Sequence, residues 1–402
     1  MTDSTDLILT ADIGTSSLKA ALADQDGNFY AFCRQRFTTT DAQEMWFSAF
    51  KSAAENLLEQ IKNTNLCKNI TGIAISGNGP TIATENHIHL WNDYNGTEEE
   101  EAVYNEQSCG SLFIPRLLYL KEHFADEFEK TNTVFAGFEF LIYQLTGTPL
   151  TVLPEQRFER AYWNNTLLQK CGFAPEKFPP FVQPGYCAGR LLPSVAEKLH
   201  LAPDTKVYCG TPDFIAALIG TDTLHTGRVC DRAGTSEGIN MCIKEPVCAE
   251  GIRTLPSVIS GLYNASFLQP DTGKKFSAFK HASVYDKMSY AETIIALLKD
   301  KSSQGYRLME EITDELKTGI KLLEKATATP VKALRTTGGQ ARNDAWNKFK
   351  ATKLGIPIEI SAMPDAELTG NAITAFFGMG RYSSLQEGAE KMAKISKTFF
   401  PE

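Results

Sequence analysis

A strand–turn–strand unit occurs twice in this chain, and it constrains the fold more than any other feature. The first copy is LTADIGTSSLKAALADQDG at residues 9–27, and the second is GRVCDRAGTSEGINMCIKE at residues 227–245. In each copy an apolar run leads into Gly-Thr-Ser and a second apolar run follows, which is typical of two strands joined by a tight turn. Because the copies lie 220 residues apart, they predict two related domains rather than a solenoid of short repeats.

The segments after the first unit favour an α/β architecture. Residues 29–37 read as a third strand, and Asp41 with Glu44 forms the pattern of a capping box before an apolar face with helical spacing. The β-branched run at residues 70–76 is typical of a strand covered on both faces. Strands followed by helices, with a hairpin in front, predict an α/β domain with a mixed sheet.

Length and composition limit the class of protein. A chain of 402 residues favours two domains, and its net charge of −8 argues against a surface for nucleic acid or anionic membranes. The start has no basic region, and no window of about 20 residues fits a spanning helix, so we expect neither a signal peptide nor a membrane segment. The nine scattered cysteines, without a C-x-x-C pair, indicate reduced thiols in a cytoplasmic protein.

The two Gly-Thr-Ser turns have the composition of phosphate sites. A tight turn exposes several backbone N–H groups, glycine permits close approach, and the hydroxyls add donors, so the set suits phosphate oxygens. Two such turns, one in each domain, would hold a polyphosphate chain between them. Asp12, near the end of the first strand, then suits Mg²⁺, which binds one or two carboxylates together with phosphates. The alternative is a polar hairpin turn without a ligand.

A carboxylate follows another predicted strand. In VYCGTPDFIAALIGTD, residues 207–222, the strand ends at Gly210 and Asp213 stands just ahead of an apolar helix. An isolated aspartate at a helix start is usually only a cap, so this position alone leaves both a structural and a catalytic role open.

Paired glycines precede a helix in the second half of the chain. Within residues 334–360 a strand meets Gly338 and Gly339, and a helix begins near Asn343. Such a pair lets a flat ring or a phosphate lie on the backbone, although for the pair alone a plain loop between strand and helix is favoured.

The order of these motifs resembles that of the FGGY carbohydrate kinases, and the resemblance covers nearly the whole chain. The matching segments are D-x-G-T-S-S-x-K at 12–19, IAISGNGPT at 73–81, residues 116–147, GTPDF at 210–214, GTS at 234–236, TTGGQARNDAW at 336–346 and LTGNAITAFFGMG at 368–380. The resemblance implies an α/β protein of two ribonuclease-H-like domains, as in the actin-like ATPases, at residues 1–226 and 227–402. ATP and a sugar would lie in the cleft between these domains.

The resemblance also implies an activity and the residues that carry it. The activity is ATP-dependent phosphorylation of a hydroxyl of a small sugar, polyol or sugar acid, with Asp213 as general base and Mg²⁺ held by Asp12 and Asp213. The residues expected to bind the nucleotide are Asp12, Gly14, Thr15, Ser16, Lys19, Gly234, Thr235, Gly338, Gly339 and Asn343. The residues expected to bind the sugar are Asn78, Thr81, Trp91, Asp93 and Asp213.

The sugar side departs from the family pattern. Gly79 and Pro80 stand where the family carries side chains that touch the sugar, and Asn95 stands where an arginine is usual. Asn371 replaces a residue that is commonly small. The phosphate side is therefore better supported than the sugar side.

These departures keep other functions open. A catalytically weak relative would bind nucleotide or sugar as a sensor or scaffold. An actin- or chaperone-like ATPase shares the implied fold, but for that class we would not expect an aspartate such as Asp213 ahead of this helix. The partners expected are ATP and a small sugar or polyol, without nucleic acid or membrane, and a homodimer is left open.

Overall fold

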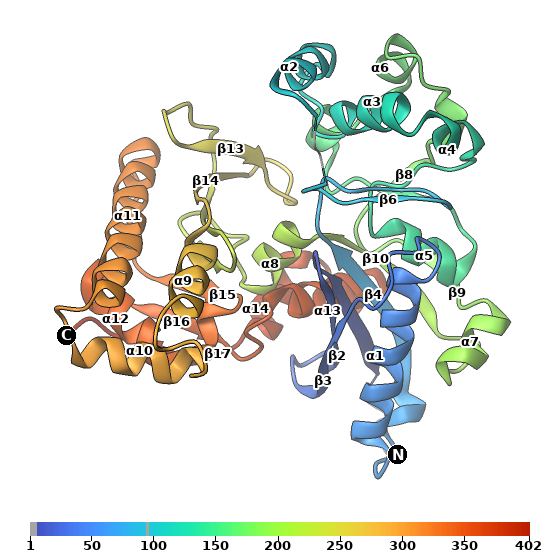
Figure 1. Cartoon of the computed structure of the whole chain (residues 1–402). Coiled ribbons are helices and arrows are strands. Elements are labelled where there is room, and N and C mark those ends of the chain that lie inside the picture. The colour runs from blue at the N-terminus through green and yellow to red at the C-terminus, as the bar shows by residue number, and fades with distance from the viewer. Residues whose placement is uncertain (1–5, 94–95) are drawn as a thin grey trace. The chain divides into compact units, whose positions relative to one another are not determined.

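The computed structural model describes residues 6–93 and 96–402, and contacts group the chain into two compact units (Figure 1). Each unit contains a central sheet with helices packed on it, so the predicted α/β class is confirmed. The first unit comprises Met1–Ala216 and Glu367–Gly388, and the second comprises Ala217–Ala366 and Ala389–Glu402.

The first unit is built on a six-stranded sheet with the order β3-β2-β1-β4-β10-β9. β1 and β2 pair antiparallel, as do β2 and β3, which is the meander expected from the sequence. β1, β4 and β10 run parallel as neighbours, and β9 pairs antiparallel with β10 at the edge. The strands are β1 (Leu7–Ile13), β2 (Ser17–Asp24), β3 (Phe29–Arg36), β4 (Ile70–Gly77), β9 (Cys187–Arg190) and β10 (Lys206–Pro212).

Helix α1 (Met45–Ile61) packs on β2 and β3 and buries Trp46, Phe50 and Leu57 against the sheet (Figure 1). The expected capping box is wrong, because α1 begins at Met45 and its N-cap residue makes no side-chain cap bond. The Asp41 carboxylate instead accepts hydrogen bonds from the backbone N–H groups of Gln43 and Glu44, at 3.0 and 3.1 Å, and so closes a turn ahead of the helix.

The segment between β4 and β9 carries further short elements of the first unit. Its strand pairs are β5 (Ile82–Ala83) with β6 (Ile88–His89) and β7 (Thr151–Val152) with β8 (Phe181–Val182). Its helices are α2 (Glu98–Gln107), α3 (Ile114–His123), α4 (Ala125–Lys130), α5 (Glu139–Thr146) and α6 (Asn165–Lys170), and α7 (Pro193–Leu199) follows β9.

The second unit is built on a seven-stranded sheet with the order β13-β14-β12-β11-β15-β16-β17. β11, β12 and β14 form an antiparallel meander, and β11, β15 and β16 run parallel. The strands are β11 (Val229–Ala233), β12 (Glu237–Ile243), β13 (Arg253–Pro256), β14 (Tyr263–Gln269), β15 (Leu334–Thr337), β16 (Ile358–Ser361) and β17 (Ile395–Phe399).

The two sheets share one topology. In both, the first strand lies between its hairpin partner and a parallel strand, and a second parallel strand follows, which is the arrangement of the ribonuclease-H-like fold. The Gly-Thr-Ser turns join β1 to β2 and β11 to β12. The repeat read from the sequence therefore marks the same place in two copies of one fold.

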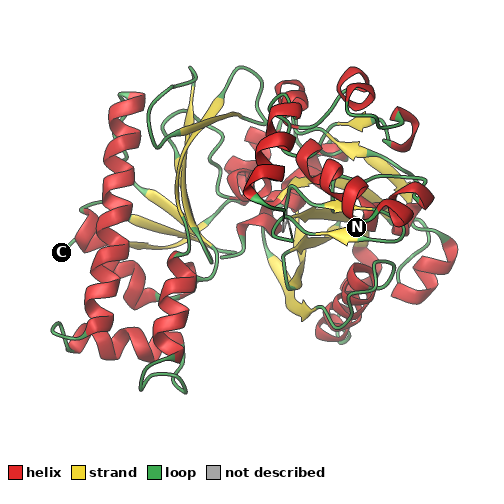
Figure 2. Ribbon diagram, turned by 45° about the horizontal axis from the view of Figure 1, so that its top comes forward, coloured by secondary structure: helices red, strands yellow, loops and turns green. Residues whose placement is uncertain are grey.

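Helices of the second unit gather beside its sheet (Figure 2). α11 (Gln304–Thr327) packs on β12 and β14, and its buried Leu316, Ile320 and Leu323 belong to the same core as Ile239 and Met241. The others are α9 (Thr272–His281), α10 (Tyr290–Lys299) and α12 (Asp344–Leu354).

The chain returns to the first unit near its C-terminus. In α13 (Ala366–Gly378), Gly370 lies so close to α8 (Asp213–Gly220) that a Cβ there would come within 2.0 Å of the Ala216 carbonyl oxygen. Because of this return, each compact unit consists of two segments of the chain, whereas the sequence predicted two continuous domains that meet between residues 226 and 227. That domain boundary stays a prediction. Helix α14 (Leu385–Met392) follows α13.

Among the described helices, none combines the length and the apolar composition that crossing a membrane requires. No disulfide bond joins any of the described cysteines.

Candidate active site

Three parallel strands of the first unit bring predicted site residues to one edge of the sheet. Asp12 is the penultimate residue of β1, Asn78 directly follows β4, and Asp213 directly follows β10. The register pairs Asp12 with Ser76 and Gly77 with Pro212, so the three strands end at the same level. Neighbouring strands lie about 4.8 Å apart, which separates the backbones of Asp12 and Asp213 by roughly 10 Å with β4 between them.

Asp12 is almost fully buried, and both of its carboxylate oxygens have partners. Ser76 donates its hydroxyl to Oδ1 at 2.7 Å, and the Lys19 ammonium lies 3.4 Å from Oδ2. Lys19 stands directly opposite Asp12 on β2 and also lies 3.9 Å from the Glu367 carboxylate. The ammonium therefore balances two carboxylates at the base of the first Gly-Thr-Ser turn.

The first turn has the predicted form. The Gly14 N–H donates to the Ser17 carbonyl at 2.9 Å, and Thr15 and Ser16 are exposed at its tip. Thr15 is the centre of a small network, because the Asn78 side-chain amide and the Trp91 indole N–H both donate to its Oγ1, each at 3.1 Å. A hydroxyl oxygen has two lone pairs, so the Thr15 proton remains as the group that can donate to a ligand.

The residues predicted for the sugar side differ in how much of each side chain is available. Trp91 is 44 % exposed. Thr81 is fully buried and donates to the Asn78 Oδ1 at 3.3 Å, which positions Asn78 rather than reaching a ligand. Asp93 accepts the Leu90 N–H at 3.0 Å and closes a turn beside Trp91. Asn95, where the sequence departs from the family, lies outside the described residues.

Asp213 is the first residue of α8 and is partly exposed. The structure thus agrees with the sequence in placing this carboxylate between a parallel strand and an apolar helix. This place fits both a helix cap and a catalytic base, so the geometry alone keeps both roles open.

The second turn, within the second unit, closes one residue earlier than the first. The Gly234 N–H donates to the Ser236 carbonyl at 3.0 Å, and Gly234 and Thr235 are exposed. The first turn of α9 holds it from one side, because the N–H groups of Gly273 and Lys274 donate to the Thr235 carbonyl at 2.9 and 3.3 Å.

The paired glycines lie beside this second turn. Gly338 has a φ of +91°, and a Cβ on it would lie 2.7 Å from the Ala233 carbonyl oxygen, so only glycine fits between β15 and the end of β11. Gly339 has open space where a side chain would be. Asn343 is nearly buried and caps α12 by accepting the Trp346 N–H at 3.0 Å, so its amide oxygen already has a structural partner.

A buried ion cluster at the base of the second turn was not predicted. Lys350 of α12 is fully buried and contacts the carboxylates of Asp231, at 2.7 Å, and Glu237, on the two strands that carry the turn. Burial raises the pKa of Glu237 to about 7. Burial alone would lower the pKa of Lys350, but the two carboxylates outweigh it and raise that pKa. No local sequence signal marks Lys350, because Asp231 lies 119 positions away.

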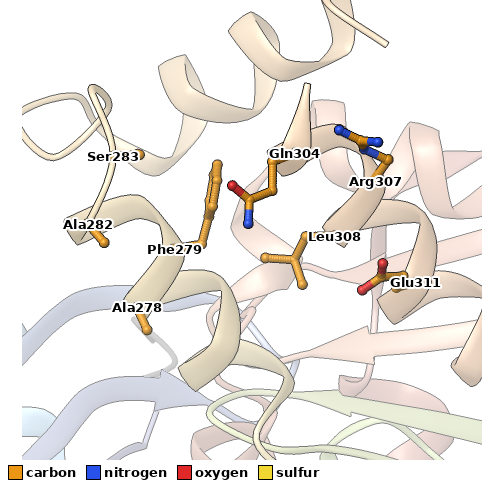
Figure 3. A pocket seen from close by; sticks show the side chains of 8 residues that line it. All are labelled: Ala278, Phe279, Ala282, Ser283, Gln304, Arg307, Leu308 and Glu311. Carbon is orange, nitrogen blue, oxygen red and sulfur yellow. The ribbon is translucent and has the colours of Figure 1, made fainter. Parts of the chain in front are cut away.

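A surface hollow of about 640 Å³ lies apart from these residues, between α9 with its following turn and α11 (Figure 3). Gln304 and Leu308 extend from α11 toward α9 in this view. The hollow is lined by Ala278, Phe279, Ala282, Ser283, Gln304, Arg307, Leu308 and Glu311. None of the residues predicted for nucleotide or sugar is among them.

Comparisons with known proteins bear on the whole chain. The pattern of the FGGY family of carbohydrate kinases, C-terminal domain, matches residues 288–379. The xylulose kinase of Bacillus subtilis (strain 168) is 23% identical over 466 residues, which cover 98% of this chain and 93% of that protein.

Solved structures show the same fold. The ligand-bound xylulose kinase from Lactobacillus acidophilus superposes with a TM-score of 0.80 at 17% identity, over 99% of this chain and 94% of that one. The Plasmodium falciparum glycerol kinase with ADP superposes with a TM-score of 0.78 at 15% identity, over 99% and 94% of the two chains. The predicted pair of ribonuclease-H-like, actin-like domains is therefore confirmed as the fold class.

Proposed function

We propose that this chain acts as a member of the FGGY family of carbohydrate kinases, and that it transfers a phosphoryl group from ATP to a hydroxyl of a small sugar, polyol or sugar acid. The observation that carries this proposal is the edge of the first sheet, where Asp12, the Thr15 network and Asp213 stand at the ends of three neighbouring parallel strands. Loops after parallel strands are the usual place for ligands in open α/β sheets.

The donors on both units suit a nucleotide with its metal ion. Asp12 and Asp213 offer hard carboxylate oxygens, the ligands that Mg²⁺ prefers, and Lys19 lies close enough to Asp12 to share in neutralising phosphate charge. The exposed turns at Thr15–Ser16 and Gly234–Thr235 offer N–H and hydroxyl donors for phosphate oxygens. We assign the backbone at Gly338 and Gly339, which has open space beside Gly339, to the nucleoside. When bound, Mg²⁺ would offset the negative charge of the transferred phosphoryl group.

Asp213 is assigned the role of general base. The acceptor hydroxyl oxygen forms a bond to the terminal phosphorus, the bond from that phosphorus to the ADP oxygen breaks, and the hydroxyl proton passes to the Asp213 carboxylate. Phosphoryl transfer has a loose transition state, so the protein contributes mainly by orienting groups and stabilising charge. A carboxylate of ordinary acidity suffices, because the hydroxyl becomes acidic only as its bond to phosphorus forms.

Trp91 is the residue best suited to contact the acceptor. Its bond to Thr15 holds the indole in place while much of the ring stays exposed, and an aromatic face suits the C–H side of a sugar. Asn78 is less available, since its amide nitrogen and oxygen are both bonded within the protein. With Gly79 and Pro80 beside it, this loop would recognise the acceptor chiefly through its backbone.

The same bonds favour one alternative function. Asn78, Thr81 and Asp93 use polar atoms for internal hydrogen bonds, which leaves fewer of them to select a sugar. A catalytically weak relative that binds nucleotide as a sensor would show this pattern. Such a protein would bind ATP without consuming it in the presence of an acceptor.

One assay separates the two functions. The protein with Mg²⁺ and ATP is screened for ADP release against ketoses, polyols and aldonates, and nucleotide binding is measured in parallel by calorimetry. ADP release that depends on one class of acceptor supports the kinase, and binding without any acceptor-dependent release supports the sensor. Absence of nucleotide binding would reject both. Light scattering of the same sample tests whether the protein forms the homodimer that the sequence left open.

A further inference from the structure

Asn371, which stands where the family commonly has a small residue, is fully buried in α13 and bonded to two elements of the first sheet. Its side-chain Nδ2 donates to the Ala11 carbonyl of β1 and to the Ser76 hydroxyl of β4, each at 2.8 Å. Ser76 in turn donates to Asp12 Oδ1 at 2.7 Å. The three side chains therefore form a chain of hydrogen bonds that ends on the carboxylate assigned to the metal site.

The direction of this chain is determined by its first acceptor. A carbonyl oxygen only accepts, so the Asn371 atom beside the Ala11 carbonyl must be the NH₂ group. The second N–H of that group then donates to Ser76, and the Ser76 proton has to point to its other neighbour, Asp12 Oδ1. The bond to Ala11 therefore fixes the orientation of the Asn371 amide, and the amide in turn fixes the direction of the Ser76 O–H.

The stability of the protein does not by itself explain an asparagine here. The Asn371 Oδ1 is buried without a hydrogen-bond partner among the described residues, and burying an unpaired amide oxygen is unfavourable. A Cβ on Gly210 would lie 2.6 Å from this oxygen, but it would also lie 2.2 Å from the Ile75 carbonyl oxygen, so β10 requires this glycine with or without Asn371. An alanine at 371 would avoid burying this unpaired oxygen.

We propose that Asn371 is a positioning residue for Asp12, acting through Ser76. Asn371 orients the Ser76 hydroxyl so that it donates to Asp12 Oδ1. The other carboxylate oxygen, Oδ2 beside Lys19, is then the one that would face hydrated Mg²⁺ and the phosphates. This inference rests on the proposed function, in which Asp12 takes part in holding Mg²⁺.

The experiment measures nucleotide binding by calorimetry over a series of Mg²⁺ concentrations, with thermal unfolding of each variant. Asn371→Ala is compared with Thr374→Val, a control in the same helix whose hydroxyl is buried and donates to the Gly370 carbonyl at 2.7 Å. We expect Asn371→Ala to raise the Mg²⁺ concentration needed for half-maximal binding about tenfold, the lower end of the effect of residues that orient metal ligands. Thr374→Val should leave this concentration unchanged.

The mechanism through Ser76 has its own test. Ser76→Ala should give the same shift as Asn371→Ala, and it provides the test if Asn371→Ala fails to fold. Adding Asn371→Ala to Ser76→Ala should then change the Mg²⁺ requirement little further. An unchanged Mg²⁺ requirement in either single variant, or full additivity of the two, would overturn the inference. A wild-type protein that binds nucleotide equally well without Mg²⁺ would reject the proposed role of Asp12 itself, and the inference with it.

Discussion

The indole N–H of Trp91 donates a hydrogen bond to the hydroxyl of Thr15 at 3.1 Å, although the two residues stand 76 positions apart in the chain. One of them was predicted for the acceptor and the other for the phosphates. Their contact ties the loop after β6 to the turn between β1 and β2. In the proposed kinase this bond would hold the loop that contacts the acceptor in a fixed position relative to the turn that binds the phosphates.

We predict that Trp91→Phe lowers kcat/KM for the acceptor by roughly 2- to 10-fold, because phenylalanine keeps an aromatic face but cannot donate to Thr15. This range corresponds to a single hydrogen bond of about 0.5–1.5 kcal/mol. Steady-state kinetics of Trp91→Phe, Thr15→Val and the double variant check it. If Trp91→Phe has the same effect with and without the Thr15 hydroxyl, the bond has no role in turnover.

Asp213→Asn separates a catalytic base from a helix cap. Asparagine caps a helix about as well as aspartate, so a mere cap would tolerate the change. A base would lose its proton acceptor, and we expect kcat to fall about 10²- to 10⁴-fold while thermal stability stays near the wild-type value. Single-turnover kinetics and calorimetry on the same preparation measure both quantities.

The control for this substitution is Asp204→Asn, which changes an exposed aspartate in the loop before β10, at the opposite end of the same strand. It should leave turnover unchanged. A folded Asp213→Asn variant that retains turnover within a factor of about three would contradict the catalytic assignment, since that lies far below a general-base effect.

Glu139 should make stability depend on pH. It is fully buried at the start of α5 and accepts the Val152 N–H at 2.9 Å, and burial raises its pKa from 4.5 to about 7. Between these values the folded protein holds a proton that the unfolded chain has released. The free energy of unfolding contributed by Glu139 therefore falls as pH rises from about 4.5 through 7.

Glu139→Gln removes this titration while keeping the shape of the side chain. Denaturant unfolding at pH 5 and pH 8 measures the effect as the difference between wild type and variant. From pH 5 to pH 8 the wild type should lose about 2–3 kcal/mol relative to Glu139→Gln. Parallel pH profiles of the two proteins would show that Glu139 is ionised in the folded state throughout.

Lys350→Met should destabilise the protein strongly. The change leaves the carboxylates of Asp231 and Glu237 buried without their cation, and breaking a buried ion pair in this way costs about 3–5 kcal/mol. Lys353→Met is the matched control in the same helix, because Lys353 is partly exposed and pairs with Glu310 at 2.8 Å. We expect the control to lose less than about 1 kcal/mol in urea unfolding. Equal losses in the two variants would mean that the buried cluster adds no stability.

Features carried by neighbouring residues could be predicted well. The apolar runs around Gly14–Ser16 and Gly234–Ser236 became the expected strands and turns, and the apolar segment after Asp213 became α8. Strand period and turn residues act over a few positions, so they can be read without knowing the rest of the chain. The start of α1 was less predictable, because Asp41 uses its carboxylate in a turn instead of capping the helix.

Features that depend on distant partners could not be predicted. Lys350 contacts Asp231 across 119 positions, and Asn371 contacts Ser76 across 295. In the sequence Lys350 resembles any other lysine of a helix, and Asn371 was visible only as a departure from the family pattern. Their roles come from burial, which removes water and leaves each polar group dependent on whichever partner the fold supplies.

The sequence by itself therefore determined the two strand–turn–strand units, the α/β class and the positions of Asp12 near the end of its strand and of Asp213 after its strand, because all of these follow from local periodicity and turn chemistry. Only the tertiary structure decided that Thr15 receives bonds from Asn78 and Trp91, that Thr81 and Asn343 turn to internal partners, and that Asn371 reaches Asp12 through Ser76. The physical reason is that a hydrogen bond needs its two groups within about 3 Å of each other. Distances of that kind between remote residues exist only after the strands have paired and α13 has packed against the first sheet.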